Sequence, residues 1–225
     1  MKENNLDSII EKILTKLNVT KIISLGDSHS NFYENLNNIE VRCIGPALAY
    51  NINKYDSKNG TKTQIVSILN ETDSSNTAFI LTFGEIDVRV HIVKRTQVEN
   101  ISLEESSIRV AKKYIEMIQY MVEKGYKVII NGLHGTGVSL AENTMFPYNG
   151  SIQDRNFATV TFNSYLEDFC NENKIPFMSL SDMVINKDTN KTRFKHMDDG
   201  CHLNSTPEIQ EIALSRFLSQ VEKFQ

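Results

Sequence analysis

A short apolar run that ends in a glycine, an acid and a serine places the strongest constraint on how this chain folds. Lys21–Leu25 has strand length, and Gly26-Asp27-Ser28 follows it directly. Such a run next to turn residues predicts a buried strand that delivers a serine onto a sharp turn at its carboxyl end. In open α/β sheets, that end of a strand is where ligands bind. Gly-Asp-Ser is also ordinary turn composition, so an alternative is that Ser28 only caps a following helix.

Strand-like and helix-like segments alternate along the rest of the chain. Each expected strand is a short apolar run, and most of the expected helices show apolar residues at intervals of three and four. The expected strands are 21–25, 41–45, 77–83, 126–133 and 175–180, and the expected helices are 4–17, 61–69, 104–124, 154–173 and a last one from about residue 205. This order predicts a parallel sheet covered by helices on both faces, a three-layer α/β/α sandwich. The length of 225 residues suits one such domain over residues 1–225.

Several finer features of these elements also follow from the pattern. Ser205 and Glu208 have the spacing of a capping box, which predicts that Ser205 opens the last helix. The apolar spacing places Val122 on the core face of the helix 104–124 and Ile212 on the buried stripe of the last helix. Residues 181–198 are polar, which predicts a surface loop.

The composition argues against several classes of function. The net charge of −4 and the pI near 5.8 leave no basic surface for nucleic acid. No apolar run approaches the roughly 20 residues of a membrane span, and the first residues lack the basic flank and apolar core of a secretory signal. Cys43, Cys170 and Cys201 are odd in number and widely spaced. We therefore expect reduced cysteines and a cytoplasmic location.

A second constellation near the end of the chain complements Ser28. Asp198-Asp199-Gly200-Cys201-His202 supplies a histidine with a carboxylate three residues before it. Serine, histidine and a carboxylate are the three parts of an activated nucleophile. Asp198 is a rival for the carboxylate role, and His202 could instead be a surface histidine. Cys201 is interpreted as a small packing residue, and His29 as at most a wall residue that points away from the serine.

Four blocks of the sequence together resemble the SGNH hydrolases, also called the GDSL esterase/lipase family. The first and last blocks are the specific ones, and all four occur in the family's order over nearly the whole chain: Gly26-Asp27-Ser28, Ile44-Gly45-Pro46, Gly84-Glu85-Ile86-Asp87 and Asp199-Gly200-Cys201-His202. The resemblance implies a flavodoxin-like five-stranded parallel sheet of order 2-1-3-4-5. It implies no metal and no organic cofactor, and it leaves the oligomeric state open.

The resemblance also assigns roles to individual residues. Ser28 corresponds to the nucleophile, His202 to the base and Asp199 to the carboxylate that orients the base. The backbone N–H groups of Ser28 and Gly45 correspond to two donors of the oxyanion hole.

The third block departs from the family pattern. Ile86 stands where the family has an asparagine donor. Arg89, Asn131 and His134 are candidates for a substitute contact to the oxyanion or the substrate. Asp87 is expected to hold loops by hydrogen bonds, with Arg89 as a partner. Glu85 and Asp87 could be a metal pair, but no His or Cys at ligand spacing accompanies them.

These features predict an ester hydrolase or acyltransferase that works through an acyl-enzyme. The expected substrate is a small molecule or glycan carrying a short acyl group, most simply acetyl. A set of aromatic residues could form a wall for sugar stacking: Phe32, Tyr33, Tyr50, Phe146 and Tyr148. The alternative is a catalytically silent binding module that keeps the pocket and has lost the oxyanion hole at Ile86.

Overall fold

A parallel sheet of five strands forms the centre of the protein. The structure is a computed structural model that describes residues 3–139 and 146–224. The strand order is β2-β1-β3-β4-β5, as the resemblance implied. The strands are β1 (Lys21–Gly26), β2 (Ile39–Cys43), β3 (Thr77–Thr82), β4 (Lys127–Asn131) and β5 (Phe177–Met178). The predicted fold class is therefore confirmed.

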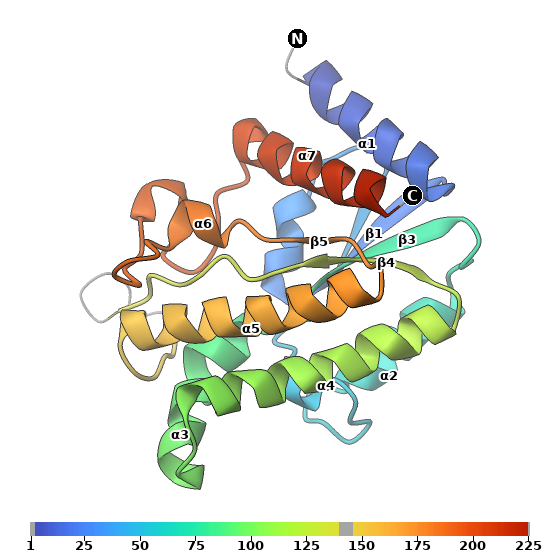
Figure 1. Cartoon of the computed structure of the whole chain (residues 1–225). Helices are drawn as coiled ribbons and strands as arrows, with labels where there is room; N and C mark the ends of the chain where they lie inside the picture. Colours follow the sequence, from blue (N-terminus) through green and yellow to red (C-terminus); the bar gives the residue numbers. More distant parts are fainter. Residues whose placement is uncertain (1–2, 140–145, 225) are drawn as a thin grey trace.

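Helices cover both faces of the sheet (Figure 1). The long helices are α1 (Glu3–Leu17), α2 (Thr61–Asn70), α4 (Leu103–Glu123), α5 (Ile152–Glu172) and α7 (Pro207–Lys223). Helices α1 and α7 pack on one face and share an apolar core with residues of the sheet such as Ile22 and Ile80. Helices α2, α4 and α5 pack on the other face, in a second core that includes Ile23 and Phe79. Neighbouring strand residues alternate between the two cores because successive side chains of a strand point to opposite faces.

The central strand β1 brings Ser28 to the carboxyl edge of the sheet. Gly26, its last residue, is in register with Cys43 of β2 and with Thr82 of β3. A β-carbon at Gly26 would lie 2.2 Å from the carbonyl oxygen of Thr82, so only glycine allows β1 and β3 to approach this closely. The backbone N–H of Asp27 then donates to the same Thr82 carbonyl, at 3.3 Å. These contacts fix the position from which the turn carrying Ser28 starts.

Several local elements differ from the sequence-based expectation. A π-helix, η3 (Asp87–Ile92), and a short helix, α3 (Val93–Glu99), follow β3. The expected loop 181–198 contains a helical turn, α6 (Ser181–Val184), and a 3₁₀ turn, η4 (Phe194–His196). Two more 3₁₀ segments are η1 (Ser28–Tyr33) and η2 (Ala49–Asn51). Short helical turns have too few residues for a periodic pattern, so spacing alone cannot reveal them.

Three finer expectations were wrong. Thr206, not Ser205, is the N-cap residue of α7, and no side-chain hydrogen bond caps this helix. Val122 is exposed on α4, where Met117 and Met121 are buried instead. Ile212 is likewise exposed on α7, and Leu214 is buried. The rest of the two expected faces is largely confirmed, since Ala111, Ile115 and Ile118 of α4 and Ile209, Ala213, Phe217 and Val221 of α7 are buried.

None of the described helices is both long enough and apolar enough to cross a bilayer.

Candidate active site

Ser28 is the first residue of the 3₁₀ segment η1, directly after β1. Asp27 is the N-cap residue of this segment, and its carboxylate accepts a hydrogen bond from the backbone N–H of His29 at 3.0 Å. The structure therefore gives the capping role to Asp27. The hydroxyl of Ser28 is left to interact elsewhere.

Ser28, His202 and Asp199 form a continuous line of hydrogen bonds. Oγ of Ser28 lies 2.8 Å from Nε2 of His202, and Nδ1 of His202 lies 2.8 Å from Oδ2 of Asp199. Because a carboxylate can only accept, Nδ1 carries the proton and Nε2 is the acceptor for the serine hydroxyl. This is the tautomer that a general base beside a serine needs.

Asp199 is held as a carboxylate by the turn it belongs to. Its Oδ1 accepts the backbone N–H groups of Cys201 at 2.9 Å and of His202 at 2.8 Å. Burial alone would raise the pKa of Asp199, but these hydrogen bonds and the His202 ring lower it below its ordinary value. The rival Asp198 is exposed, and it is Asp199 that bonds the His202 ring.

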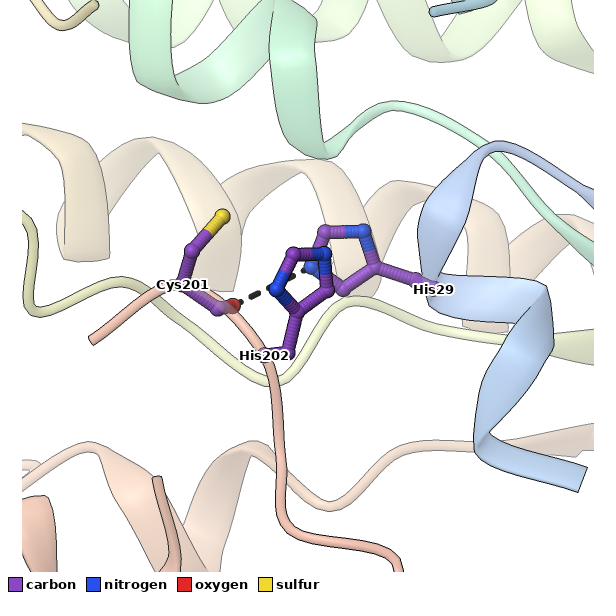
Figure 2. A group of neighbouring side chains, drawn as sticks. All are labelled: His29, Cys201 and His202. Atoms are coloured by element: carbon purple, nitrogen blue, oxygen red, sulfur yellow. Dashed lines mark hydrogen bonds between the residues drawn. The ribbon is translucent and has the colours of Figure 1, made fainter. Parts of the chain in front are cut away.

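Two further histidines lie beside His202. The His29 ring has its centroid 4.6 Å from that of His202 and 5.1 Å from that of His134. Figure 2 shows that the carbonyl oxygen of Cys201, rather than its sulfur, faces His29. Nε2 of His29 and Nε2 of His134 lie 3.1 Å and 3.0 Å from that carbonyl oxygen. His29 is therefore a buried part of the site, contrary to the expectation that it points away.

His29, Cys201 and His202 also have the composition of a metal site, since their ligand-type atoms lie within 4.8 Å of one another (Figure 2). Both ring nitrogens of His202 bond to Ser28 and Asp199, and both of His29 face Asp27 and Cys201. The thiol of Cys201 donates to Glu85 at 3.5 Å. A metal ion here would have to displace hydrogen bonds on which the site is built.

Arg89 pairs with Glu85 in the interior. Its Nε donates to Oε1 of Glu85 at 2.7 Å, and its Nη1 donates to the carbonyl of Pro147 at 2.6 Å. Its guanidinium lies over the Phe146 ring, 5.4 Å from the centroid, and that ring meets the His202 ring edge to face at 5.7 Å. Arg89 thus joins the π-helix η3 to Phe146 and Pro147, and Phe146 in turn contacts His202.

Asp87 organises a different loop. Its two carboxylate oxygens accept the backbone N–H groups of Ala49 at 2.7 Å and of Tyr50 at 3.3 Å. Burial raises the pKa of Asp87 to about 7, against the opposing effect of these two bonds. The expected partner Arg89 is bonded to Glu85, and Asp87 holds the segment after Gly45 instead.

Gly45 follows β2 with φ of +76°, a conformation that favours glycine. Within the described part of the chain, the N–H groups of Ser28 and Gly45 donate to no protein acceptor. Ile86 is partly exposed and begins the turn into η3.

A pocket with a volume of about 290 Å³ opens beside Ser28 and His202. It has apolar walls from Phe32, Leu180 and Leu203, and polar groups that include Asn31, Glu34, Asn131, His134 and Ser205. Asn131 donates to the Thr82 hydroxyl at 3.2 Å, which uses one of its two amide hydrogens. Asn131 and His134, both singled out from the sequence, thus share a cavity with the serine.

The expected aromatic wall is divided among several places. Phe32 lines the pocket and Phe146 touches His202. Tyr33 is fully buried in the core below α7. Tyr50 and Tyr148 lie against Arg95 and Arg155, with the guanidinium carbons 3.8 Å and 4.8 Å from the ring centroids. The pairing of these tyrosines with arginines was not visible in the sequence.

Comparisons with known proteins find solved structures that share this architecture. No protein-family model matches the sequence, and a comparison with curated proteins finds no match. Solved structures do match: a candidate acylhydrolase of Bacteroides fragilis aligns with a TM-score of 0.61 at 15% identity, covering 92% of this chain and 88% of that one. A GDSL-like lipase of Bacteroides thetaiotaomicron gives 0.57 at 16%, covering 97% and 98%. An acetyl xylan esterase gives 0.51 at 16%, covering 88% and 98%.

The chain shares the fold of these acylhydrolase and lipase structures. In this fold, Ser28 and His202 both lie at the carboxyl edge of the sheet, after β1 and after β5. Sequence reasoning missed His29, although Asp27 two residues before it was a signal. Aspartate and histidine two residues apart around a tight turn can face the same side.

Proposed function

We propose that this protein is a serine ester hydrolase or acyltransferase of the SGNH type, acting through an acyl-enzyme. The observation that carries the proposal is the hydrogen-bonded line from Oγ of Ser28 through the His202 ring to Asp199. A serine hydroxyl is a weak nucleophile at its free pKa, and such a line is the arrangement that activates it.

The reaction follows from the proton positions in this hydrogen-bonded triad, in which Nδ1 of His202 carries a proton and Nε2 is free to accept one. Oγ of Ser28 attacks the ester carbonyl carbon while Nε2 of His202 takes the hydroxyl proton. The tetrahedral intermediate then expels the alcohol, which receives the proton back from Nε2. Water, or an acceptor alcohol, repeats these steps in reverse and releases the acid or the transferred ester. Asp199 stabilises the imidazolium that forms in each half-reaction.

The oxyanion would be bound by the backbone N–H groups of Ser28 and Gly45. Both donors are without a protein acceptor within the described residues, which leaves them available. Asn131 is the best-placed group to supply a third donor in place of Ile86, because it lines the pocket and has a second amide hydrogen. His134 lines the same pocket, but its Nε2 faces the Cys201 carbonyl. Arg89 is held by Glu85 and Pro147.

The substrate we propose is a short acyl ester, most simply acetyl, of a carbohydrate. The pocket of about 290 Å³ is near the lower end of the range for small-molecule sites. The aromatic face of Phe32 and the amides of Asn31 and Asn131 are groups that suit a polyhydroxylated ring. The similarity to an acetyl xylan esterase is in keeping with this choice.

A substrate panel tests the proposal. Purified protein and its Ser28→Ala variant would be assayed on acetylated mono- and oligosaccharides and on aryl esters of increasing acyl length. We expect turnover that depends on Ser28 and is fastest for acetylated sugars. Turnover that rises with acyl length would overturn the substrate class. Sugar binding by calorimetry without Ser28-dependent turnover would instead support a silent binding module, which the isoleucine at position 86 favours.

A further inference from the structure

The histidine that follows the nucleophile is buried between two hydrogen-bond acceptors. Nδ1 of His29 lies 3.0 Å from Oδ1 of Asp27, and Nε2 lies 3.1 Å from the carbonyl oxygen of Cys201. The His29 side chain is 5% exposed and that of Asp27 1%, so solvent cannot stand in for either contact. The ring therefore has to satisfy both partners itself.

The chemistry of these two partners fixes the protonation of the ring. A backbone carbonyl oxygen has no proton to donate. Asp27 acts on His29 as a negatively charged carboxylate, which also has no proton to donate, and its Oδ1 accepts the backbone N–H of His29 at 3.0 Å as well. Both ring nitrogens must then be donors, which only the imidazolium form provides. Burial by itself would lower the pKa of His29, but the charge and hydrogen bond of Asp27 raise it well above its ordinary value.

We propose that His29 is a buried, charged positioning residue that connects the turn carrying the nucleophile to the loop carrying the base. The carbonyl that it holds belongs to the peptide unit between Cys201 and His202. The N–H of that same unit donates to Oδ1 of Asp199 at 2.8 Å. His29 thus bonds the carbonyl oxygen of this peptide unit, and Asp199 bonds its N–H. The unit directly precedes the side chain of His202.

Of the two imidazoles that bond the Cys201 carbonyl, the surrounding groups favour a positive charge on His29 and none on His134. Asp27 and Glu85 are the acids that act on it, and His134, His202 and Cys201 are the other titratable groups around it. Burial, together with the nearby charge of His29, lowers the pKa of His134 to about 3, so that ring is neutral and donates from Nε2 to the Cys201 carbonyl. The cluster therefore consists of a charged and a neutral imidazole that share one acceptor.

Nuclear magnetic resonance tests the charge state directly and does not depend on enzymatic activity. Protein labelled with ¹⁵N in its histidine rings would be studied at about pH 8, above the ordinary histidine pKa of about 6.5. His29→Gln assigns the ring signals, and His196→Gln is the matched control. If His29→Gln does not fold, variants at the other four histidines assign His29 by elimination. We expect protons on both ring nitrogens of His29. A single ring proton at pH 8 would overturn the imidazolium.

Kinetics test the positioning role, which rests on the proposed function. We expect His29→Gln to lower kcat at least tenfold with KM changed less than twofold, while His196→Gln matches the wild type. Such a split is expected because His29 acts on the alignment of His202 and not on substrate binding. The value of kcat is calculated per folded protein, since a loss of stability alone leaves kcat of the folded protein unchanged. An active wild type with kinetics equal to those of folded His29→Gln would refute the positioning role alone. Ser28-independent activity would refute the proposed function instead.

Discussion

Nε2 of His202 lies 2.8 Å from Oγ of Ser28, although 174 residues separate the two along the chain. The sheet explains this proximity. Ser28 follows the central strand β1, and His202 lies in the segment between β5 and α7, so both reach the carboxyl edge of the same parallel sheet. Ligand sites of open α/β sheets form at this edge. The sequence distance is thus a consequence of strand order, and the two residues can act as one unit.

Removing either member of this pair should abolish turnover. We expect Ser28→Ala and His202→Ala each to lower kcat on the best ester by roughly 10³-fold or more, because such residues act together. Thermal unfolding should change little, since both side chains lie at the surface of the pocket. Steady-state kinetics with both variants check this. More than about a tenth of the wild-type rate in Ser28→Ala would show that the nucleophile is another residue.

The two neighbouring aspartates should differ sharply in effect. Asp199→Asn places an amide against Nδ1 of His202 and favours the tautomer that directs an N–H at Ser28, so kcat should fall by about 10³-fold or more. Asp198 is exposed, and Asp198→Asn should stay within about threefold of the wild type. Parallel measurement of kcat decides between them. A larger loss for Asp198→Asn would transfer the orienting role to that residue.

The buried ion pair of Arg89 and Glu85 predicts a rescue. Arg89→Met leaves the Glu85 carboxylate buried without its cation, which should cost on the order of 3 kcal/mol of the free energy of unfolding. Adding Glu85→Gln removes that charge and should restore part of the loss. Urea unfolding of the single and double variants measures both effects. A double variant less stable than Arg89→Met would contradict this account.

The same Arg89 variant separates pairing from a contact with the oxyanion or the substrate. With pairing alone, kcat/KM of the folded variant should stay within about threefold of the wild type. A contact with the transition state would instead lower kcat/KM at least tenfold, or about 1.4 kcal/mol. The assay should be run well below the unfolding temperature of Arg89→Met, so that the variant is fully folded.

The charge on His29 predicts how stability depends on pH. Folded His29 binds its proton more tightly than the unfolded chain does: burial lowers its pKa, but Asp27, Cys201 and Glu85 together raise it well above the ordinary value. Its contribution to the free energy of unfolding is therefore complete below about pH 6.5 and is lost as the pH rises through the folded pKa. The stability difference between wild type and His29→Gln should shrink above pH 6.5 by up to about 1.4 kcal/mol per pH unit. A difference that is constant between about pH 6.5 and 9 would exclude a raised pKa.

The regular elements were predictable because they carry repeated signals. Apolar runs such as Phe79–Leu81 at the centre of β3 require burial, and α1 and α4 are long enough and amphipathic enough to show a helical period. The predicted triad residues also came together, since Ser28 directly follows β1 and the long segment between β5 and α7 brings Asp199 and His202 to the same edge of the sheet. The π-helix η3 was not predictable, because its residues Asp87 and Arg89 are fixed by distant partners at Ala49 and Pro147. The burial of His29 likewise depends on Cys201, a contact across 172 residues.

Labelling with a fluorophosphonate tests the central claim most directly, because the probe reacts with an activated serine whatever the natural ester is. The protein, its Ser28→Ala variant and its Asp198→Asn variant would be treated beside a control esterase, and the adduct located by peptide mass spectrometry. We predict one adduct, on Ser28, that forms equally in Asp198→Asn and is absent in Ser28→Ala. An unlabelled wild type under conditions that label the control, or an adduct on another residue, would contradict the account.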